Sequence, residues 1–381
     1  MDLAAQDRLI KLACALIQRP SITPSDAGCQ QLLAQQLQQA GFTIEQMKFA
    51  QVDNLFAYHN GSKKGQSLLF CGHTDVVPTG EELLWDFPPF AAKITENYLY
   101  GRGAADMKSA VAAFSLAMID FVQHNPQHKG KVSVLLTSDE EGAAQDGIKK
   151  MMPHIASHHS FDYCVVGEPS SSEKLGDVVR IGRRGSLHVQ ITIHGKQGHV
   201  AYAENARNPV FLAAKFIDEL SQHKWDGGNA DFPPTSFQIS SVKTSSATAN
   251  IIPADLTLSA NFRYAPVSTQ ESLASQLQAL LQKHNLKYSL QWNLSGLPFH
   301  NTNKGFKQLV KHAITQVTGT KPVFNAAGGT SDGRFIAPFG VDVLELGVCN
   351  TTIHQINECV CVADVINLYK IYKQIITDLL G

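Results

Sequence analysis

The sequence lacks the features that mark several classes of protein. Its 381 residues carry a formal net charge of -1, with neither a basic stripe for nucleic acid nor a long acidic run. No apolar run approaches the length needed to span a membrane. The opening stretch, "MDLAAQDRLIKLACALIQRP", mixes apolar and charged residues at helical spacing. We therefore expect a first helix rather than a signal peptide, and no nucleic-acid or membrane partner.

Cysteine is sparse. The seven cysteines are an odd number, and only Cys359 and Cys361 lie close together, without Cys-x-x-Cys spacing. This usage favours reduced cysteines and a cytoplasmic location. The 44% hydrophobic and 17% charged composition is typical of a globular protein, and the length allows two domains with a sizeable core.

Apolar runs of strand length alternate with helical patterns in the first part of the chain. Residues 67–71, 131–137 and 162–166 predict buried strands, and residues 109–122 predict a helix. Fully apolar strands between helices indicate an α/β domain whose mostly parallel sheet is flanked by helices. The same pattern returns in the last part of the chain, so we assign residues 1–179 and 297–381 to this domain.

A different pattern interrupts this domain. Leu187, Val189, Ile191 and Ile193 alternate with polar residues, as expected of a half-buried strand. The elements that follow have the order β-α-β-β-α-β, which predicts a ferredoxin-like α+β domain inserted at residues 180–296.

Acidic residues and histidines follow the predicted strands or precede the predicted helix. Because strand ends of a parallel sheet share one edge, these side chains are expected to converge there. They are His73, Asp75, Asp106, Asp139, Glu140, Glu141, Glu168 and His354.

Each of these residues has a simpler explanation when taken alone. Asp106 could cap the helix that follows it, "HTD" could form a turn, and His354 could be an ordinary loop histidine. Taken together, several unpaired carboxylates on one rim would destabilise the fold unless a cation were bound. The set therefore favours a metal site.

The residue types narrow the choice of metal. Two histidines with several carboxylates and no cysteine suit Zn, Co or Mn better than a structural cysteine-rich zinc site. The set is too large for one tetrahedral ion, so we expect two ions bridged by Asp106, each with one histidine and one further carboxylate. Two ions about 3.5 to 4 Å apart would lower the pKa of a shared water molecule.

At these motifs the sequence resembles the dinuclear-zinc aminoacylase and carboxypeptidase superfamily. The matching segments are "GHTDVVP" (72–78), "GRGAADMK" (101–108), "TSDEEG" (137–142) and "GEPS" (167–170). Within it, the sequence is most similar to the succinyl-diaminopimelate desuccinylase family. That narrower resemblance rests on "VVRIGRRGSL" (178–187), "GKQGHVAY" (195–202), "GGTSDGRF" (328–335) and "NTTIHQINE" (350–358). Together these segments cover most of the chain.

The resemblance implies a role for each candidate residue. Asp106 would bridge the two ions, His73 and Glu168 would bind one, and Glu141 and His354 the other. It also implies a cis peptide bond between Asp106 and Met107.

Three further residues receive catalytic roles from the resemblance. Glu140 would be the general base, and Asp75 would orient His73. His199, in the inserted domain, would reach the active site of a partner subunit and support the oxyanion; it could instead be a capping or turn histidine. The family's substrate-holding positions are matched by Arg183, Ser186, Tyr202, Asn250, Arg263, Gly329, Thr330 and Asn350.

The implied reaction is metal-dependent hydrolysis of the amide of N-succinyl-L,L-2,6-diaminopimelate, a step in the biosynthesis of lysine and cell-wall precursors. The products are succinate and L,L-diaminopimelate. A homodimer formed through the inserted domain is expected. The alternatives are a related amidase, such as an acetylornithine deacetylase or a metallocarboxypeptidase, and a non-catalytic metal-binding relative.

Overall fold

The computed structural model describes residues 3–381, which fall into two compact units. The first comprises residues 3–182, Asn301–Asn325 and Ser331–Gly381, and the second Arg183–His300 and Ala326–Thr330. The predicted domains and the roles assigned to them stay predictions.

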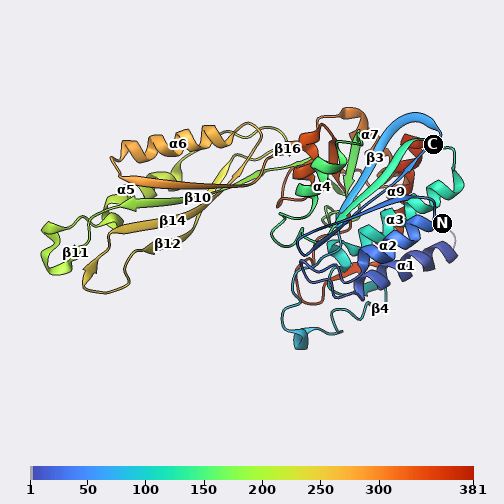
Figure 1. Ribbon diagram of the computed structural model, residues 1–381, viewed down its shortest axis with the longest axis horizontal. Helices are drawn as coiled ribbons and strands as arrows, with labels where there is room; N and C mark the ends of the chain where they lie inside the picture. Colours follow the sequence, from blue (N-terminus) through green and yellow to red (C-terminus); the bar gives the residue numbers. More distant parts are fainter. Residues whose placement is uncertain (1–2) are drawn as a thin grey trace. The chain divides into compact units, whose positions relative to one another are not determined.

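The first unit is built on a large sheet of eight strands, which includes β3 in Figure 1. Its strand order is β1-β2-β6-β3-β7-β18-β8-β17. The central strands β6, β3, β7 and β18 are parallel neighbours, as are β8 and β17. The strand bounds are β1 (Thr43–Phe49), β2 (Val52–Asn60), β3 (Lys63–His73), β6 (Lys129–Thr137), β7 (Tyr163–Val166), β8 (Val178–Arg180), β17 (Val323–Asn325) and β18 (Asp342–Glu345).

The rest of this sheet limits the prediction of a mostly parallel sheet to its central strands and to the pair β8–β17. The pairs β1–β2, β2–β6 and β18–β8 are antiparallel, so the sheet is mixed. A two-residue connection joins β1 to β2, with Ala50 at φ 52°. Antiparallel strands accept such a tight turn, whereas parallel strands need a long crossover. The helical crossovers that the sequence shows clearly therefore belong to the central strands.

Helix α3 (Ser109–His124) is the central helix of the first unit's core. Its residues from Ser109 to Val122 are all buried, as its apolar sequence predicts. It packs against α1, α9 and strands β3 and β6, and burying Phe114 and Phe121 contributes about 1.5–3 kcal/mol each. The other helices of this unit are α1 (Leu3–Ile17), α2 (Cys29–Gln39), α4 (Ile148–Ile155), α7 (Lys304–Thr318), α8 (Gly333–Ile336) and α9 (Val362–Leu380).

A small three-stranded sheet has the order β19-β5-β4. Its strands are β4 (Lys93–Thr95), β5 (Tyr98–Tyr100) and β19 (Cys359–Cys361). Its antiparallel pairing places Cys359 opposite Tyr100, which brings the segment after His354 beside the segment before Asp106.

The second unit holds a four-stranded antiparallel sheet with the order β12-β14-β10-β15. Leu187, Val189, Ile191 and Ile193 are all buried, as their period-two spacing predicts. The chain order is β10 (Gly185–His194), α5 (Pro209–Gln222), β12 (Ser236–Thr244), β14 (Asp255–Tyr264), α6 (Gln270–Lys283) and β15 (Tyr288–Gly296). Figure 1 shows both helices running along this sheet.

Short elements complete the described chain. They are β9 (Gly182–Arg183), β11 (Gly198–His199), β13 (Ile251–Ile252), β16 (Phe299–His300), the 3-10 helices η1 (Glu82–Leu84), η3 (Val200–Asn205) and η4 (Ala337–Phe339), and the π-helical turn η2 (Ala104–Lys108). Among residues 3–381, no helix combines the length and apolar character that crossing a membrane requires.

Candidate metal centre

Neighbouring parallel strands deliver the candidate residues to one edge of the first unit's sheet. Strand β3 ends at His73, β6 ends just before the segment with Glu140 and Glu141, and β7 ends just before Glu168. Because β6, β3 and β7 are adjacent and parallel, their carboxyl ends meet at the same edge.

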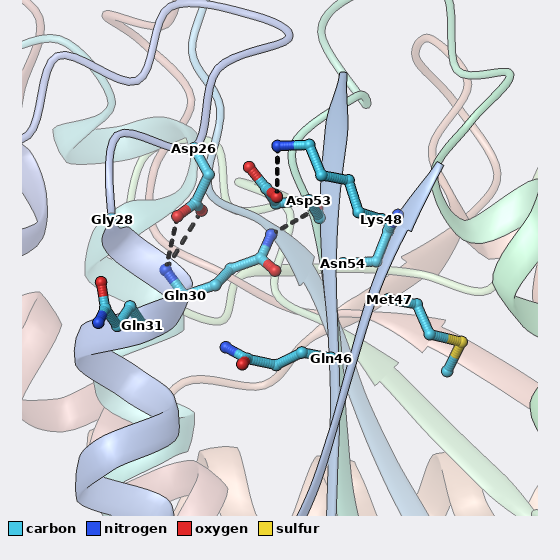
Figure 2. A pocket seen from close by; sticks show the side chains of 9 residues that line it. All are labelled: Asp26, Gly28, Gln30, Gln31, Gln46, Met47, Lys48, Asp53 and Asn54. Atoms are coloured by element: carbon cyan, nitrogen blue, oxygen red, sulfur yellow. Dashed lines mark hydrogen bonds and ion pairs between the residues drawn. The ribbon is translucent and has the colours of Figure 1, made fainter. Parts of the chain in front are cut away.

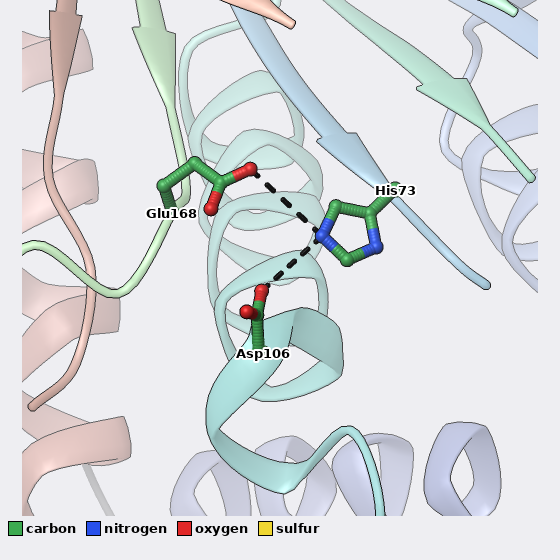
Figure 3. Close-up of side chains that lie close together, drawn as sticks. All are labelled: His73, Asp106 and Glu168. Carbon is green, nitrogen blue, oxygen red and sulfur yellow. Dashed lines mark hydrogen bonds and ion pairs between the residues drawn. The ribbon is translucent and has the colours of Figure 1, made fainter. Parts of the chain in front are cut away.

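The first group of possible ligands is His73, Asp106 and Glu168 (Figure 3). His73 Nε2 lies 3.2 Å from Asp106 Oδ1 and 3.8 Å from Glu168 Oε1. One atom from each residue lies within 4.8 Å of the other two. The histidine comes from a strand end and Asp106 from the turn before α3, so the main sheet and its central helix hold this group.

The second group is Asp106, Glu141 and His354. His354 Nε2 lies 3.0 Å from Glu141 Oε1 and 3.5 Å from Asp106 Oδ2. Asp106 therefore belongs to both groups, with Oδ1 facing His73 and Oδ2 facing His354. This is the arrangement that a bridging carboxylate requires.

The backbone around Asp106 agrees with the sequence analysis. The Asp106–Met107 peptide bond is cis, which confirms that prediction. The alternative that Asp106 caps α3 is wrong, because Lys108 occupies the N-cap position; within the described chain no side-chain hydrogen bond caps that helix.

The protonation of His73 follows from its contacts. Its Nδ1–H donates to the backbone carbonyl of Asp75 at 2.9 Å, which leaves Nε2 facing Asp106 and Glu168. Burial lowers the pKa of His73, but the hydrogen bond to Asp106 and the neighbouring carboxylates raise it well above its usual value. A proton on Nε2 thus offsets the acidic surroundings, as a cation could.

The pKa values of the other residues in the two groups also indicate that positive charge is needed there. Burial, followed by the charges of Asp106 and Glu140, raises the pKa of Glu168 well above its usual value. Glu168 Oε1 is buried and has no hydrogen-bond partner among residues 3–381. For Asp106, burial raises the pKa, yet hydrogen bonds to His354 and His73 give a net lowering. The hydrogen bonds to Asp106 and Glu141 raise the pKa of His354 to about 10.

These observations fit divalent ions. Imidazole nitrogens with carboxylate oxygens are suitable donors for zinc and similar ions. An ion at each group would satisfy the orphaned oxygen of Glu168 and replace the protons that the two histidines otherwise hold.

Glu140 lies beside these groups but belongs to neither group of three that the described residues form. Burial and the charge of Asp332 raise its pKa to about 8, with Glu141 and Asp106 adding to the effect and His73 opposing it. A carboxyl group with a pKa near neutrality is suited to proton transfer. Glu140 and Glu141, which are adjacent in the sequence, therefore lie in different environments.

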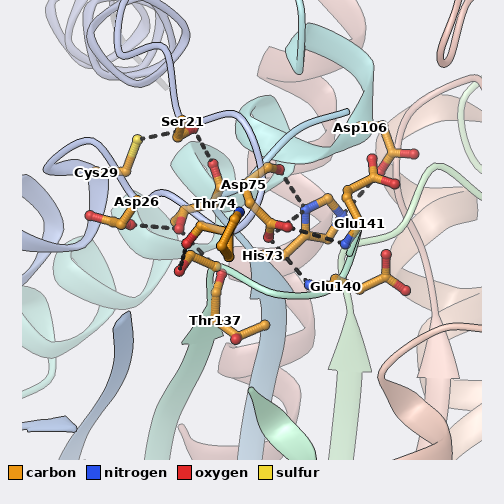
Figure 4. Close-up of polar contacts among 12 residues, drawn as sticks. Ser21, Asp26, Cys29, His73, Thr74, Asp75, Asp106, Thr137, Glu140 and Glu141 are labelled. Atoms are coloured by element: carbon orange, nitrogen blue, oxygen red, sulfur yellow. Dashed lines mark hydrogen bonds and ion pairs between the residues drawn. The ribbon is translucent and has the colours of Figure 1, made fainter. Parts of the chain in front are cut away.

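Asp75 differs in detail from its predicted role. His73 is held by the backbone carbonyl of Asp75, while the Asp75 carboxylate lies 3.7 Å from His73 Nδ1. That carboxylate accepts the backbone N–H groups of Glu140 at 3.4 Å and Glu141 at 3.2 Å (Figure 4). Because its oxygens turn toward these amides, the Asp75 side chain fixes the loop that carries both glutamates.

A polar network supports the segment next to His73 (Figure 4). The Thr74 hydroxyl donates to Asp26 Oδ1 at 2.6 Å, and the Ser21 hydroxyl donates to the Thr74 carbonyl at 2.6 Å. Beside it lies a polar pocket, shown in Figure 2. There the Gln30 side chain donates to the Asp53 carbonyl at 2.8 Å.

Asp139 has a structural role in the turn that follows β6. It is buried, and its Oδ2 accepts the backbone N–H groups of Gln145 at 2.7 Å and Asp146 at 2.8 Å. Of the three adjacent acids, it is the one committed to backbone hydrogen bonds.

The predicted substrate-holding residues lie mainly in the second unit. There, Arg183 donates to the Ala327 carbonyl at 3.0 Å, and Ser186 accepts from Asn261 at 3.1 Å and pairs with Arg263 across two strands. The same unit contains Tyr202, Asn250, Gly329 and Thr330, whereas Asn350 belongs to the first unit. Their roles stay predictions.

His199 makes the contact of a capping residue. Its Nδ1 accepts the backbone N–H of Ala201 at 3.1 Å, at the start of η3. This is the alternative that the sequence left open. The hydrogen bond occupies Nδ1 and leaves the predicted oxyanion role of His199 a prediction.

Sequence reasoning missed three buried charged residues around the centre. Burial raises the pKa of Asp332 to about 6 against the opposing charge of Arg334, and its Oδ2 has no hydrogen-bond partner in the described part of the chain. Arg102 and Glu358 form a buried ion pair. All three lie inside motifs quoted for the resemblance, but nothing in their spacing signals a buried charge.

The fold and the two groups that share Asp106 define a metal-dependent hydrolase. Residues 69–378 match the model of peptidase family M20/M25/M40, and the chain belongs to this family.

The chain is similar to curated relatives along nearly its whole length. It is 48% identical over 373 residues to a succinyl-diaminopimelate desuccinylase of Marinobacter nauticus, covering 98% of both chains. It is 49% identical over 374 residues to one of Pseudomonas fluorescens, covering 98% of this chain and 97% of the relative. Its fold resembles that of the Bacillus subtilis YXEP protein, a dinuclear metal binding peptidase from the M20 family. That match has a TM-score of 0.75 at 15% identity and covers 99% of both chains.

Proposed function

We propose that this chain hydrolyses the amide bond of N-succinyl-L,L-2,6-diaminopimelate to succinate and L,L-diaminopimelate. The observation that carries the chemistry is Asp106, whose two carboxylate oxygens each face a different histidine. The names of relatives at 48% and 49% identity support the substrate. The reaction would serve the synthesis of lysine and cell-wall precursors.

Two divalent ions, zinc before cobalt or manganese, are proposed as cofactors. His73 and Glu168 would hold one, Glu141 and His354 the other, and Asp106 would bridge them. Bound there, the ions would polarise the amide carbonyl and lower the pKa of a nearby water molecule.

Glu140 is proposed as the general base. Its carboxylate takes a proton from the attacking water as the oxygen adds to the amide carbon. It then returns the proton to the departing nitrogen as the C–N bond breaks. Asp75 keeps Glu140 in place by accepting the backbone N–H groups of Glu140 and Glu141.

The substrate carries carboxylates at its ends, which suit cationic and amide donors. Arg183 and Arg263 are proposed to bind them, because a guanidinium group matches a carboxylate with two parallel hydrogen bonds. The remaining proposed contacts come from Ser186, Tyr202, Asn250, Gly329, Thr330 and Asn350.

The assembly and location are part of the proposal. The inserted ferredoxin-like domain would form a homodimer, in which His199 would support the oxyanion in the partner's active site. The location would be cytoplasmic, which the reduced state expected of the seven cysteines supports.

Two alternatives to a desuccinylase predict different observations. An acetylornithine deacetylase or metallocarboxypeptidase would use the same metal ligands, so only the substrate separates it from a desuccinylase. A non-catalytic relative would have lost the base or a ligand, and here Glu140 and all five proposed ligands are present.

A direct assay tests the proposal. The purified protein is loaded with Zn²⁺ or Co²⁺, and amide loss is followed for N-succinyl-L,L-diaminopimelate and for N-acetylornithine. We expect turnover of the first and little of the second. Turnover of N-acetylornithine alone would overturn the proposed substrate, and turnover of neither would favour the non-catalytic alternative.

A further inference from the structure

A buried carboxylate directly supports the backbone of Asp106. Glu358 is 0% exposed, and its Oε1 accepts the N–H of Ala105 at 2.9 Å and of Asp106 at 3.0 Å. Its Oε2 accepts the N–H of Gly103 at 3.0 Å and Arg102 Nη1 at 2.8 Å. A carboxylate offers about four lone-pair sites, so these four donors use its whole capacity.

Arg102, the ion-pair partner of Glu358, contacts two further segments of the chain. The Arg102 guanidinium also donates from Nη1 to the carbonyl of Gln355 and from Nη2 to that of Pro78, both at 3.2 Å. Gln355 directly follows His354, and Pro78 lies five positions after His73. One buried ion pair thus contacts the three segments that carry His73, Asp106 and His354.

The His354 segment needs such support. His354 has a φ of 60° and Asn357 a φ of 61°, left-handed values that non-glycine residues rarely adopt. Each such position costs on the order of 1 kcal/mol or more unless its surroundings hold it. Besides the Arg102 contact to Gln355, the Glu358 carbonyl accepts the N–H of Gly101, so side-chain and backbone contacts both fix this loop.

We propose that the Arg102–Glu358 pair is a positioning device for the two metal sites. It places the Asp106 carboxylate between His73 and His354, so both sites form together. The inference rests on the metal-binding part of the proposed function. Residues that orient ligands typically alter metal affinity by about 10–100-fold when they are replaced.

Asp120 offers a matched control in the same unit. It is a buried carboxylate on α3 that accepts hydrogen bonds from Arg8 and Tyr369. None of these partners lies on a segment with a proposed ligand. Asp120→Asn therefore weakens an ion pair of a buried carboxylate with the half-exposed Arg8, without touching the metal centre.

The test compares full-length Glu358→Gln, Glu358→Asp, Arg102→Lys and Asp120→Asn proteins after metal removal. Each is titrated with Co²⁺, recording calorimetric affinity, stoichiometry and the visible absorption bands of the bound ion; thermal unfolding is measured alongside. We expect Glu358→Gln to bind Co²⁺ about 10–100-fold more weakly, with altered bands. Asp120→Asn should lose thermal stability yet keep the wild-type affinity and bands.

The conservative variants keep the test decisive if Glu358→Gln does not fold. Arg102→Lys retains the charge but loses the fork that reaches Gln355 and Pro78, and Glu358→Asp shortens the reach to the Asp106 amide. Both should weaken Co²⁺ binding and shift the bands. Wild-type binding and bands in the folded variants would overturn the positioning role. Failure of the wild-type protein to bind two ions would instead count against the proposed function.

Discussion

The two ligand groups that share Asp106 are held by the chain in different ways. His73 ends a central strand and its side chain is 1% exposed, whereas His354 sits on a loop and its side chain is 49% exposed. Glu168 follows another central strand, while Glu141 is held by amide contacts to Asp75. The group of His73, Asp106 and Glu168 is therefore held mainly by the core. The group of Asp106, Glu141 and His354 depends on loop contacts, and we call it the loop-borne group.

The two groups depend on different parts of the fold. His73 and Glu168 of the first group come together wherever the central sheet forms, because adjacent parallel strands share an edge. The loop-borne group forms only when long-range contacts fix the path of the loop. We therefore expect the two groups to respond differently to substitution.

The largest effect is expected for Asp106, the residue common to both groups. Asp106→Asn removes the shared charge, so both sites should lose their ions together. Activity should fall by roughly 10⁴-fold or more, the scale seen when a whole catalytic unit is disabled. Elemental analysis of the dialysed variant measures the metal content. Retention of one tightly bound ion would show that the groups are independent.

Glu140 should separate metal binding from catalysis. Glu140→Ala leaves both ligand groups intact, so it should still bind two ions while kcat falls by about 10²–10⁴-fold. Parallel measurement of metal content and steady-state rate provides the check. An undiminished rate in the metal-loaded variant would remove Glu140 as the base.

Replacing His73 or His354 tests the contrast between the two ligand groups. The measured quantity is the stability of the metal-free protein. His73→Ala leaves a buried gap beside Asp106 and Glu168, and should lower the free energy of unfolding by roughly 2–5 kcal/mol. His354→Ala removes a half-exposed side chain and should cost less than about 1 kcal/mol. Chemical denaturation of both variants measures the difference. Equal losses would contradict the contrast between a core-held and a loop-held group.

The smallest expected effect is the change in the stability of the metal-free protein with pH. The pKa of His354 is raised to about 10 in the folded, metal-free protein, above its usual 6.5. A raised folded pKa gives stability that is fully present below pH 6.5 and lost as pH rises toward 10. The stability difference between the metal-free wild type and His354→Ala should therefore shrink across that interval. Denaturation at several pH values tests this, and a difference that grows with pH would be opposite in sign.

The convergence of His73 and Glu168 at one sheet edge was predictable from the sequence for a physical reason. The apolar runs before His73 and Glu168 identify buried strands, and the edge rule then brings those residues together. The antiparallel edge was missed, because the sequence of β1 does not reveal which strand it pairs with or in which direction. Pairing partners of edge strands are decided by tertiary packing.

The supports of the site were harder to predict. Arg102 and Glu358 are 256 positions apart, and neither residue type signals burial, since charged residues are usually exposed. Asp75 was found but with a different contact, because the choice between its backbone and its carboxylate depends on the loop conformation. These details arise from the folded backbone rather than from residue spacing.

The shared role of Asp106 is tested most directly by anomalous X-ray scattering from crystals of the zinc-loaded protein. A shared Asp106 predicts two peaks about 3.5–4 Å apart, the spacing typical of two-metal sites, one on each side of its carboxylate. One peak would contradict it, as would two peaks of which one lies away from Asp106.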